Sequence, residues 1–265
     1  MQFKTDFLRS YAEQTPLPLA VERVQECDLL CHQEFAEPVL DVGCGDGIFA
    51  SCLFDEKVEL GIDLNARELE HAGSMNAYKE LVCCAGDEVP RPDGSFRTAF
   101  SNSVLEHIPD LPPVIREVHR LLDDGGRFYV TVPTNRFDQY TVGYQILSRL
   151  RLKGLAKRFQ AFFNRFWHHF HFYRPDDWER MFRENGFRVV ERKEYGRKSL
   201  CLLNDAMAPL CLPSFCAKKF LNRWVLFPKL HRVLMQGPVA LLNRVLKRSP
   251  ESRKGGLLFL SLEKC

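Results

Sequence analysis

The stretch VLDVGCGDGIFA, residues 39–50, passes from a short apolar run through a turn with three glycines into a second apolar run. This pattern predicts a buried strand, a tight turn and the start of a helix. Gly43, Gly45 and Gly47 are spaced as G-x-G-x-G, whereas the dinucleotide fingerprint G-x-G-x-x-G needs a glycine where Ile48 stands. The spacing therefore argues against a redox dinucleotide at this turn.

Four carboxylates lie near this turn or near the ends of the following strands. Asp41 and Asp46 flank the turn, so their negative charge opposes a phosphate and suits a cation. Asp63 ends the second predicted strand, where it can accept hydrogen bonds from ribose hydroxyls. Asp87 follows the third strand, where it can accept one from an exocyclic adenine amine. An adenosine that carries a positively charged sulfonium satisfies all of these groups together.

The order of the predicted elements indicates the fold class. Helical spacing over residues 17–36 precedes five strands that alternate with helices, predicted at 39–42, 58–63, 81–85, 98–103 and 127–133. A further helix is marked by Pro175, by a capping box of Asp176 with Glu179, and by Gly186 at its end. Two β-like runs follow, at 187–195 and 256–264. The alternation predicts an α/β fold with a doubly wound parallel sheet.

Five segments resemble, in order and spacing, the class I S-adenosylmethionine-dependent methyltransferases, and most closely the bacterial branch often called type 11. They are VLDVGCGDG, GIDLN, AGDEVPRPDGSF, SNSVLEHIPD and REVHRLLDDGGRFYVTVP. The resemblance covers residues 38–133 and returns at 172–195. It implies S-adenosylmethionine as cofactor, S-adenosylhomocysteine as product, and a Rossmann-like sheet of seven strands, mostly parallel, with the last strand antiparallel.

The resemblance also implies which residues bind the cofactor. It assigns Asp41 and the turn Gly43, Cys44, Gly45 and Gly47 to the methionine part, and Asn102 or Ser103 to the methionine side. It assigns Asp63 to the ribose hydroxyls and Asp87 to the adenine amine, and we include their neighbours Leu64 and Glu88 in the expected site.

His107, in LEHI after the fourth strand, is the candidate general base for an alcohol or phenol acceptor. The alternative is a structural histidine bonded to the backbone at the start of a helix. Glu106-His107 is similar to the E-x-x-E-H metal site of some relatives, but Ser103 replaces the first glutamate, so we expect no metal. The D/N/S-P-P-Y/F motif of enzymes that methylate exocyclic base nitrogens is missing, which favours an oxygen acceptor.

Charge divides the chain. Residues 1–133 hold 11 Lys and Arg against 24 Asp and Glu, whereas residues 134–174 hold 8 against 1 and residues 196–255 hold 12 against 2. Both basic segments leave the sheet at its carboxyl edge, and their apolar residues recur at helical spacing. We therefore expect one domain, 1–265, with the parts 1–37 (helical), 38–133 (cofactor-binding core), 134–174 (helical insertion), 175–195 (helix and strand), 196–255 (helical insertion) and 256–265 (last strand).

The two insertions are expected to form a lid over the cofactor. In one interpretation they only pack against each other and the core; in the other they receive a lipid-like or anionic acceptor, or rest on an anionic membrane surface. Nucleic acid is disfavoured, because bulky aliphatic residues separate the cations. Residues expected to face the acceptor are His168 and His171 in a catalytic role, and Tyr11, Tyr140, Tyr144, His169 and Tyr173 in a binding role; the alternative for the histidines is lid packing.

The sequence thus predicts an S-adenosylmethionine-dependent methyltransferase that acts on the oxygen of a small or lipid-linked acceptor. Methylation of carbon or nitrogen in a small metabolite is an alternative, and so is a non-catalytic cofactor-binding adaptor for a membrane or partner. The ten cysteines form no C-x-x-C pair, and the start MQFKTDFLRS lacks a long apolar segment. We expect a cytoplasmic protein, with peripheral contact at the inner face of the membrane as a further expectation.

Overall fold

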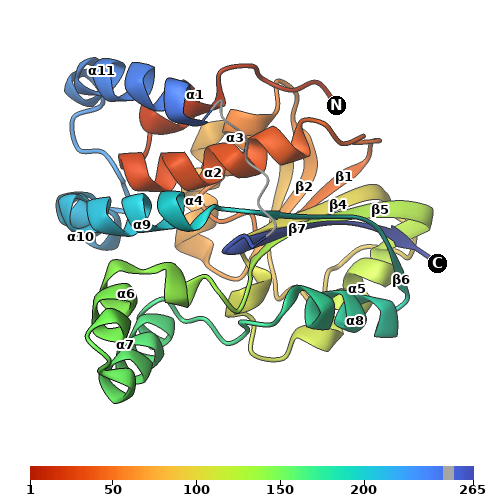
Figure 1. Ribbon diagram of the computed structural model, residues 1–265. Helices are drawn as coiled ribbons and strands as arrows, with labels where there is room; N and C mark the ends of the chain where they lie inside the picture. Colours follow the sequence, from red (N-terminus) through yellow and green to blue (C-terminus); the bar gives the residue numbers. More distant parts are fainter. Residues whose placement is uncertain (247–253) are drawn as a thin grey trace.

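A seven-stranded sheet forms the centre of the computed structural model, which describes residues 1–246 and 254–265 (Figure 1). The strand order is β3-β2-β1-β4-β5-β7-β6, and β7 is antiparallel to both of its neighbours while the other pairs are parallel. The strands are β1 Val39–Val42, β2 Val58–Asp63, β3 Tyr78–Cys83, β4 Phe96–Asn102, β5 Leu122–Pro133, β6 Phe187–Tyr195 and β7 Leu257–Lys264. The predicted doubly wound, mostly parallel sheet is confirmed.

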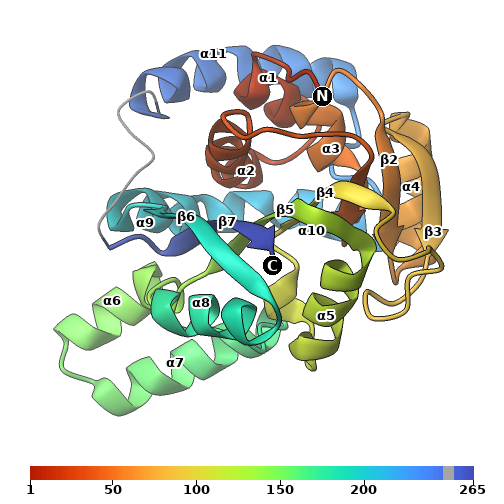
Figure 2. The same cartoon turned by 90° about the vertical axis from the view of Figure 1, so that its right-hand side faces the viewer.

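Helices cover both faces of the sheet. They are α1 Phe7–Ala12, α2 Leu17–Leu30, α3 Ile48–Leu53, α4 Ala66–Met75, α5 Leu111–Leu121, α6 Val142–Arg149, α7 Lys153–Phe166, α8 Pro175–Glu184, α9 Lys198–Met207, α10 Leu212–Leu221 and α11 Pro228–Leu246, with the 3-10 turns η1 Leu105–His107, η2 Asp138–Tyr140 and η3 Ala208–Cys211. Two hydrophobic clusters result, one with residues of α1 to α4 and the other with residues of α5 and α8. Figure 2 shows α5 and α8 on one side of the sheet and α1 to α3 on the other.

The central parallel strands β1, β2 and β4 are mostly buried on both faces, which explains their apolar sequences, whereas the edge strand β3 is largely exposed. All four residues of β1 are buried, and Leu40 pairs with Leu60 of β2 on one side and with Ala99 of β4 on the other. This central position places the turn after β1 at the carboxyl edge, beside the ends of β2 and β4. In an open α/β sheet that edge is where ligands bind.

Local details differ from the sequence expectations. The third strand lies at Tyr78–Cys83, earlier than predicted, and β5 begins at Leu122. The capping box at α8 is wrong: Arg174 is the N-cap, Pro175 is the first helical residue, and no side chain caps the helix. Arg192 of β6 instead binds Asp176 (2.6 Å) and Glu179 (2.9 Å), because a guanidinium forms stronger hydrogen bonds with carboxylates than a neutral amide does.

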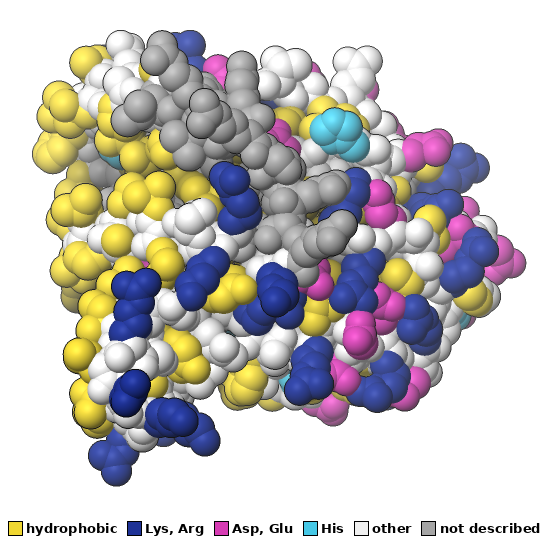
Figure 3. Space-filling view, in the orientation of Figure 1, with side chains coloured by type: hydrophobic (Ala, Val, Ile, Leu, Met, Phe, Trp, Pro, Cys, Tyr) yellow, Lys and Arg dark blue, Asp and Glu magenta, His cyan; other side chains and the backbone are white. Residues whose placement is uncertain are grey.

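The two predicted insertions are helical, and both lie at one end of the sheet (Figure 1). The first contains η2, α6 and α7, and the second contains α9, η3, α10 and α11; residues 247–253 of the second lie outside the described residues. The space-filling view shows apolar side chains gathered along this end, next to Lys and Arg (Figure 3). In the described part of the chain, Lys198–Leu221 is the one helical stretch long and apolar enough to cross a membrane, and only 17% of its most apolar window is buried.

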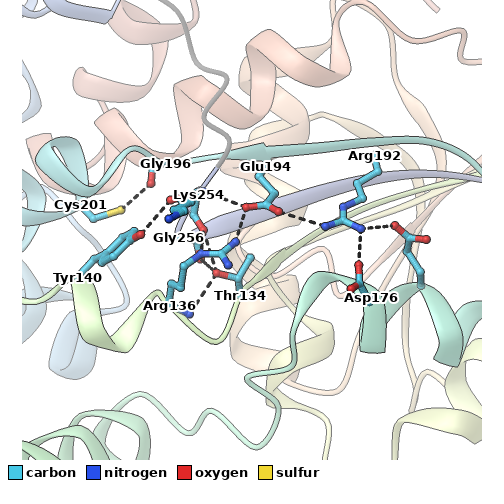
Figure 4. A network of polar contacts seen from close by, with 12 residues as sticks. Thr134, Arg136, Tyr140, Asp176, Arg192, Glu194, Gly196, Cys201, Lys254 and Gly256 are labelled. Atoms are coloured by element: carbon cyan, nitrogen blue, oxygen red, sulfur yellow. Dashed lines mark hydrogen bonds and ion pairs between the residues drawn. The ribbon is translucent and has the colours of Figure 1, made fainter.

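A network of polar contacts joins the two insertions where they leave the sheet (Figure 4). Arg136 at the start of the first insertion binds Glu194 at the end of β6, and Glu194 also binds Arg192 (3.2 Å). Thr134 Oγ1 donates to the Gly256 carbonyl (3.1 Å), and the Tyr140 hydroxyl donates to the Lys254 carbonyl (3.0 Å). These contacts hold the residues where both insertions join the sheet in a fixed position.

Candidate functional site

The glycine turn after β1 has backbone conformations that glycine adopts without strain. Gly43, Gly45 and Gly47 have φ angles of +80°, +54° and +76°. A Cβ atom on Gly43 would lie 2.4 Å from Val104 Cγ1, and one on Gly47 would lie 2.9 Å from Ala72 Cα. A Cβ on Gly45 would have nothing within 4 Å, so open space lies beside the backbone there. The turn thus offers a cradle that a ligand can approach closely.

Asp63 and its neighbours lie beside this cradle. Asp63 Oδ2 accepts a hydrogen bond from the Gly45 N–H (2.9 Å), which fixes the carboxylate and leaves lone pairs for a ligand. Leu64, the next residue, is 75% exposed. Asp87 and Glu88 are exposed in the loop after β3, and β3 pairs with β2. These positions fit the ribose and adenine of the expected cofactor, and the assignments themselves stay predictions.

The carboxylates that flank the turn do not present the free charge expected from the sequence. Asp41 is 3% exposed, its Oδ2 accepts from the Tyr78 hydroxyl (2.7 Å), and burial raises its pKa to about 8. Asp46 Oδ2 accepts from Lys218 Nζ (3.0 Å) and from Trp224 Nε1 (2.9 Å). Asp41 is therefore buried, and Asp46 shares Lys218 with Glu68 (2.6 Å), so neither carboxylate presents an unpaired charge to the turn. The expected preference of the turn for a cation stays a prediction. The predicted contact of Asp41 and Cys44 with the methionine part is untested.

A buried hydrogen-bond network surrounds Glu26 of α2, which is completely buried. Glu26 accepts from Arg23 through both oxygens (2.8 Å each), from Asn102 (2.7 Å), from Ser103 (3.0 Å) and from Tyr195 (3.1 Å). Ser103 has φ +52°, an uncommon conformation for a residue with a side chain. The network joins α2 to the ends of β4 and β6, so Asn102 and Ser103, both expected at the methionine side, have fixed orientations.

Sequence reasoning did not identify Arg23 and Glu26. Their spacing of three residues on a helix with many apolar positions is a signal of an ion pair on one helix face. It does not indicate that this face points to the end of the sheet. Burial alone would lower the pKa of Arg23, but Glu26 and Glu22 raise it above its usual value, so the guanidinium is charged.

A cavity of about 340 Å³ lies between the end of the sheet and the two insertions. Both insertions contribute to its wall, together with α2 and the segment after β4. Most of its lining side chains are apolar, and they include Leu19, Val21, Phe137, Phe163, Trp167, Leu200, Phe215, Trp224 and Leu257. Ser103, Glu106, His107, Tyr140 and His169 also line it. Because Ser103 belongs both to this wall and to the expected methionine side, the cavity lies next to the predicted cofactor site.

His107, Glu106 and His169 form the polar part of this wall. His107 Nδ1 donates to the His168 carbonyl (3.2 Å), so its Nε2 is the nitrogen that can accept a proton. Burial lowers the pKa of His107, and burial together with His107 lowers the pKa of His169 to about 4. Glu106 is 3% exposed, its Oε2 has no hydrogen-bond partner among the described residues, and burial raises its pKa to about 8.

One ligand atom from each of Glu106, His107 and His169 lies within 4.8 Å of the other two, a spacing that would suit a metal ion. The expectation that no metal is required stays a prediction.

The structure places the other expected acceptor residues outside the cavity lining. Tyr11 of α1 is 2% exposed and belongs to the core, and Tyr144 is half-buried on α6. His171 Nε2 bonds to the Ile108 carbonyl (2.8 Å), and its ring stacks on Tyr173, which packs against the second hydrophobic cluster.

His168 is exposed and offers only its backbone carbonyl to His107. Tyr11, Tyr144, His168, His171 and Tyr173 thus lie outside the lining of the cavity, and their expected roles at the acceptor stay untested. His168 and His171 do not share a helix face as their spacing suggested, because α7 ends at Phe166.

Comparisons with known proteins identify the family of the chain. A family model described as "Methyltransferase domain" matches residues 17–192. The putative methyltransferase YrhH of Bacillus subtilis is 24% identical over 58% of this chain and 88% of its own. A sarcosine/dimethylglycine N-methyltransferase of Halorhodospira halochloris is 35% identical over 44% of this chain, and a ubiquinone biosynthesis O-methyltransferase of Sodalis glossinidius is 33% identical over 38%. These matches span less than half of the last two relatives, 46% and 43%.

Solved structures share the fold. A possible histamine N-methyltransferase of Thermotoga maritima has a TM-score of 0.56 at 15% identity, over 94% of this chain and 92% of its own. A geranyl diphosphate C-methyltransferase of Streptomyces coelicolor, crystallised with S-adenosyl-L-homocysteine, has a TM-score of 0.53 at 15% identity, over 94% and 82%. With the glycine cradle, the acids beside it and the strand order, these matches show that the chain belongs to the class I S-adenosylmethionine-dependent methyltransferases.

Proposed function

We propose that this enzyme methylates a hydroxyl oxygen of a small or lipid-linked acceptor that binds in the cavity beneath the two insertions. The observation that carries the proposal is the cavity itself, whose walls are mostly aliphatic and aromatic. Polar side chains line it next to the predicted methionine side (Ser103, Glu106, His107 and His169), and charged and amide side chains of α2 and α9 line it as well (Glu22, Arg23, Gln25, Asn204 and Asp205). Such a wall suits an acceptor with a large apolar part and a reactive polar end. Nucleic acid fits it poorly, because a nucleotide would bring phosphates into this apolar space.

His107 is the proposed base. Bound S-adenosylmethionine would supply a methyl carbon to which an acceptor oxygen forms a bond while the carbon–sulfur bond breaks and its electron pair stays on sulfur. The His168 carbonyl holds the Nδ1 proton of His107, so Nε2 can take the hydroxyl proton as the new bond forms. The ring of His169 lies 5.1 Å from that of His107 and also contacts Phe163. Positioning in the cavity supplies most of the remaining rate enhancement.

The names of the relatives do not decide the acceptor atom. The relative from Sodalis glossinidius is named an O-methyltransferase and the one from Halorhodospira halochloris an N-methyltransferase. We favour oxygen because His107 offers a proton acceptor and because the motif for base nitrogens is missing after β4. Methylation of nitrogen or carbon remains the alternative that the product analysis below distinguishes.

The decisive experiment uses S-adenosylmethionine with a labelled methyl group and a cell extract. The label is followed into the lipid, polar-metabolite, nucleic-acid and protein fractions, and the labelled product is identified by mass spectrometry. We expect label in a lipid or small-molecule fraction as a methyl ether or ester. Label in nucleic acid, or on nitrogen or carbon, would refute the proposed acceptor. Cofactor binding without label in any fraction would indicate a non-catalytic adaptor.

Two variants test the roles of single residues. We expect His107→Asn to lower kcat by about 10²–10⁴-fold with little change in cofactor affinity, whereas the matched control His32→Asn, outside the cavity, has no effect. We expect Asp63→Ala to weaken S-adenosylhomocysteine binding by about tenfold or more, because it removes the charged carboxylate oxygens that accept hydrogen bonds at the proposed ribose site. Asp55→Ala, another exposed aspartate, is the control. Calorimetry and initial rates measure both effects.

A further inference from the structure

The exposed apolar side chains are concentrated on the insertions. In the described part of the chain, 18 of the 20 large hydrophobic residues classed as exposed lie in residues 134–174 and 196–255. The 18 form what we call the insertion surface: Ile146, Leu150, Leu152, Leu155, Phe162, Phe166, Phe170, Phe172, Leu203, Leu210, Leu212, Phe220, Leu221, Leu226, Phe227, Leu230, Val233 and Leu234. Figure 3 shows apolar side chains along the edge formed by α11, α10, α6 and α7.

Several residues of the insertion surface have most of their side-chain area exposed to solvent. Leu210 is 80% exposed, Phe220 73% and Phe227 70%. On α11, Leu230 and Leu234 are one helical turn apart and lie on the same side of the helix, and both are more than half exposed. Scattered apolar residues are normal on a soluble protein, but a continuous group of this size indicates a surface that another phase or molecule covers.

Most cations beside this surface have no acidic partner; Lys218 and Arg232 are exceptions, paired with Asp46 and Glu13. Eleven exposed Lys and Arg residues of the insertions form no ion pair with a carboxylate of the described chain: Arg149, Arg151, Lys153, Lys157, Arg158, Arg165, Arg174, Lys198, Lys219, Arg223 and Lys229. The two described acids of the insertions face inward. Asp138 is buried and accepts from Asn164, and Asp205 accepts from the Val142 N–H. The insertion surface therefore combines apolar side chains with uncompensated positive charge.

A chain of aromatic rings connects this surface to the cavity. Exposed Phe162 contacts Phe166, whose ring lies 5.1 Å from that of Trp167. Trp167 then contacts Phe215 across the two insertions (5.6 Å), and Phe215 contacts Trp224 (5.5 Å). Trp167, Phe215 and Trp224 line the cavity. The outer surface and the proposed acceptor site thus share one apolar wall.

We propose that the insertion surface docks on an anionic phospholipid bilayer and that the acceptor enters the cavity from that bilayer. Apolar side chains that enter the acyl boundary and cations that contact anionic headgroups are the two requirements for interfacial binding. A second copy of this chain would bring like charges together. A nucleic acid would meet the cations but leave the leucines and phenylalanines exposed to water. Only the entry of the acceptor rests on the proposed function; docking stands without it.

Flotation of the full-length protein with vesicles tests the docking. The vesicles contain phosphatidylcholine alone or phosphatidylcholine with phosphatidylglycerol, at low and at high salt. We expect binding to the anionic vesicles that salt weakens. The variant Phe220→Ser/Phe227→Ser should reduce the partition coefficient by about tenfold or more, since two large exposed rings no longer enter the membrane. Val190→Ser, at a residue 49% exposed on β6, is the matched control and should bind normally.

Charge variants give a second, independent result. Replacing Lys153, Lys157 and Arg158 with Gln should reduce binding to anionic vesicles by about fivefold for each cation that lies near the membrane. Arg97→Gln, outside the insertions, is the control. Calorimetry with S-adenosylhomocysteine is run on every variant, and we expect unchanged affinity. If the wild type does not bind the cofactor, the methyltransferase function is refuted. If the wild type binds the cofactor but no vesicles, only the docking is refuted.

Four results would overturn the docking proposal. The first is that the wild type binds neither kind of vesicle. The second is self-association in solution that the phenylalanine variant abolishes, which would assign the surface to a second copy. The third is binding to RNA in place of vesicles. The fourth is retention on the vesicles after alkaline carbonate extraction, which would indicate that Lys198–Leu221 spans the bilayer.

Discussion

Replacing Glu26 with methionine tests whether the buried network holds α2 against the end of the sheet. Glu26 is completely buried and accepts hydrogen bonds from four side chains, one of which is the cation Arg23. Methionine has a similar length but no acceptor. The variant would leave a buried guanidinium and three neutral donors without their partner.

The expected loss of stability follows from the exposure of Arg23. Breaking a buried ion pair by removing one partner costs about 3–5 kcal/mol. The Arg23 side chain is 20% exposed and borders the cavity, so water can solvate part of it. We therefore expect a loss near the lower limit, about 3 kcal/mol, which corresponds to a decrease in Tm of about 6–12 °C for a chain of this size.

Urea unfolding at pH 7 measures this loss, and two comparisons make it specific. Asp177→Asn breaks the exposed pair with Arg180 and should cost at most about 1 kcal/mol. The double variant Arg23→Met/Glu26→Met also removes the unpaired cation. Its loss of stability should therefore be smaller than the sum of the two single losses by at least about 1 kcal/mol. A Glu26→Met loss no larger than that of Asp177→Asn, or strictly additive losses, would refute the network as a source of stability.

Three further predictions follow from the site. Burial raises the pKa of Glu106 from 4.5 to about 8, so its contribution to stability is full below pH 4.5 and is lost as the pH rises to about 8. Urea unfolding at several pH values measures the resulting decrease in the free energy of unfolding. Glu106→Gln should make this decrease smaller, and an unchanged dependence on pH would refute the assignment. Gly47→Ala should destabilise by about 1–3 kcal/mol, because φ is +76° and its Cβ would meet Ala72, whereas Gly154→Ala, in open space on α7, should stabilise by up to about 1 kcal/mol. A chelator should leave turnover unchanged; a loss that a divalent cation restores would show that the histidines and Glu106 hold a metal.

The sequence predicted the parts of this structure that depend on local pattern. The strand before the glycine turn, the turn itself and the alternation of strands and helices each leave a signal within a few residues. The order of the strands and the direction of β7 came from the resemblance, since hydrophobic periodicity carries no information on strand pairing. The insertions were predicted as helices from their spacing, and α6, α7, α9, α10 and α11 confirm this.

The contacts that determine the site join residues far apart in the chain. Tyr195 bonds to Glu26 across 169 positions, and Lys218 bonds to Asp46 across 172. No pattern in either segment indicates its partner. The same reason explains why the sequence did not indicate the contact of His171 with the Ile108 carbonyl, 63 positions away. Pairs of this kind are set by tertiary packing, which a single sequence does not specify.

The pairing of Asp46 changes the physical reason why this turn excludes a dinucleotide. Lys218 binds Asp46 at 3.0 Å and Glu68 at 2.6 Å, so the repulsion of a phosphate is weaker than a free carboxylate would cause. The second cause is steric. Ile48 occupies the third glycine position of the dinucleotide fingerprint and is 3% exposed within the core. In dinucleotide-binding folds that glycine allows the helix to pack closely on the strand, which the Ile48 side chain prevents here, whereas the open side of Gly45 and the acceptors of Asp63 fit a nucleoside with a sulfonium.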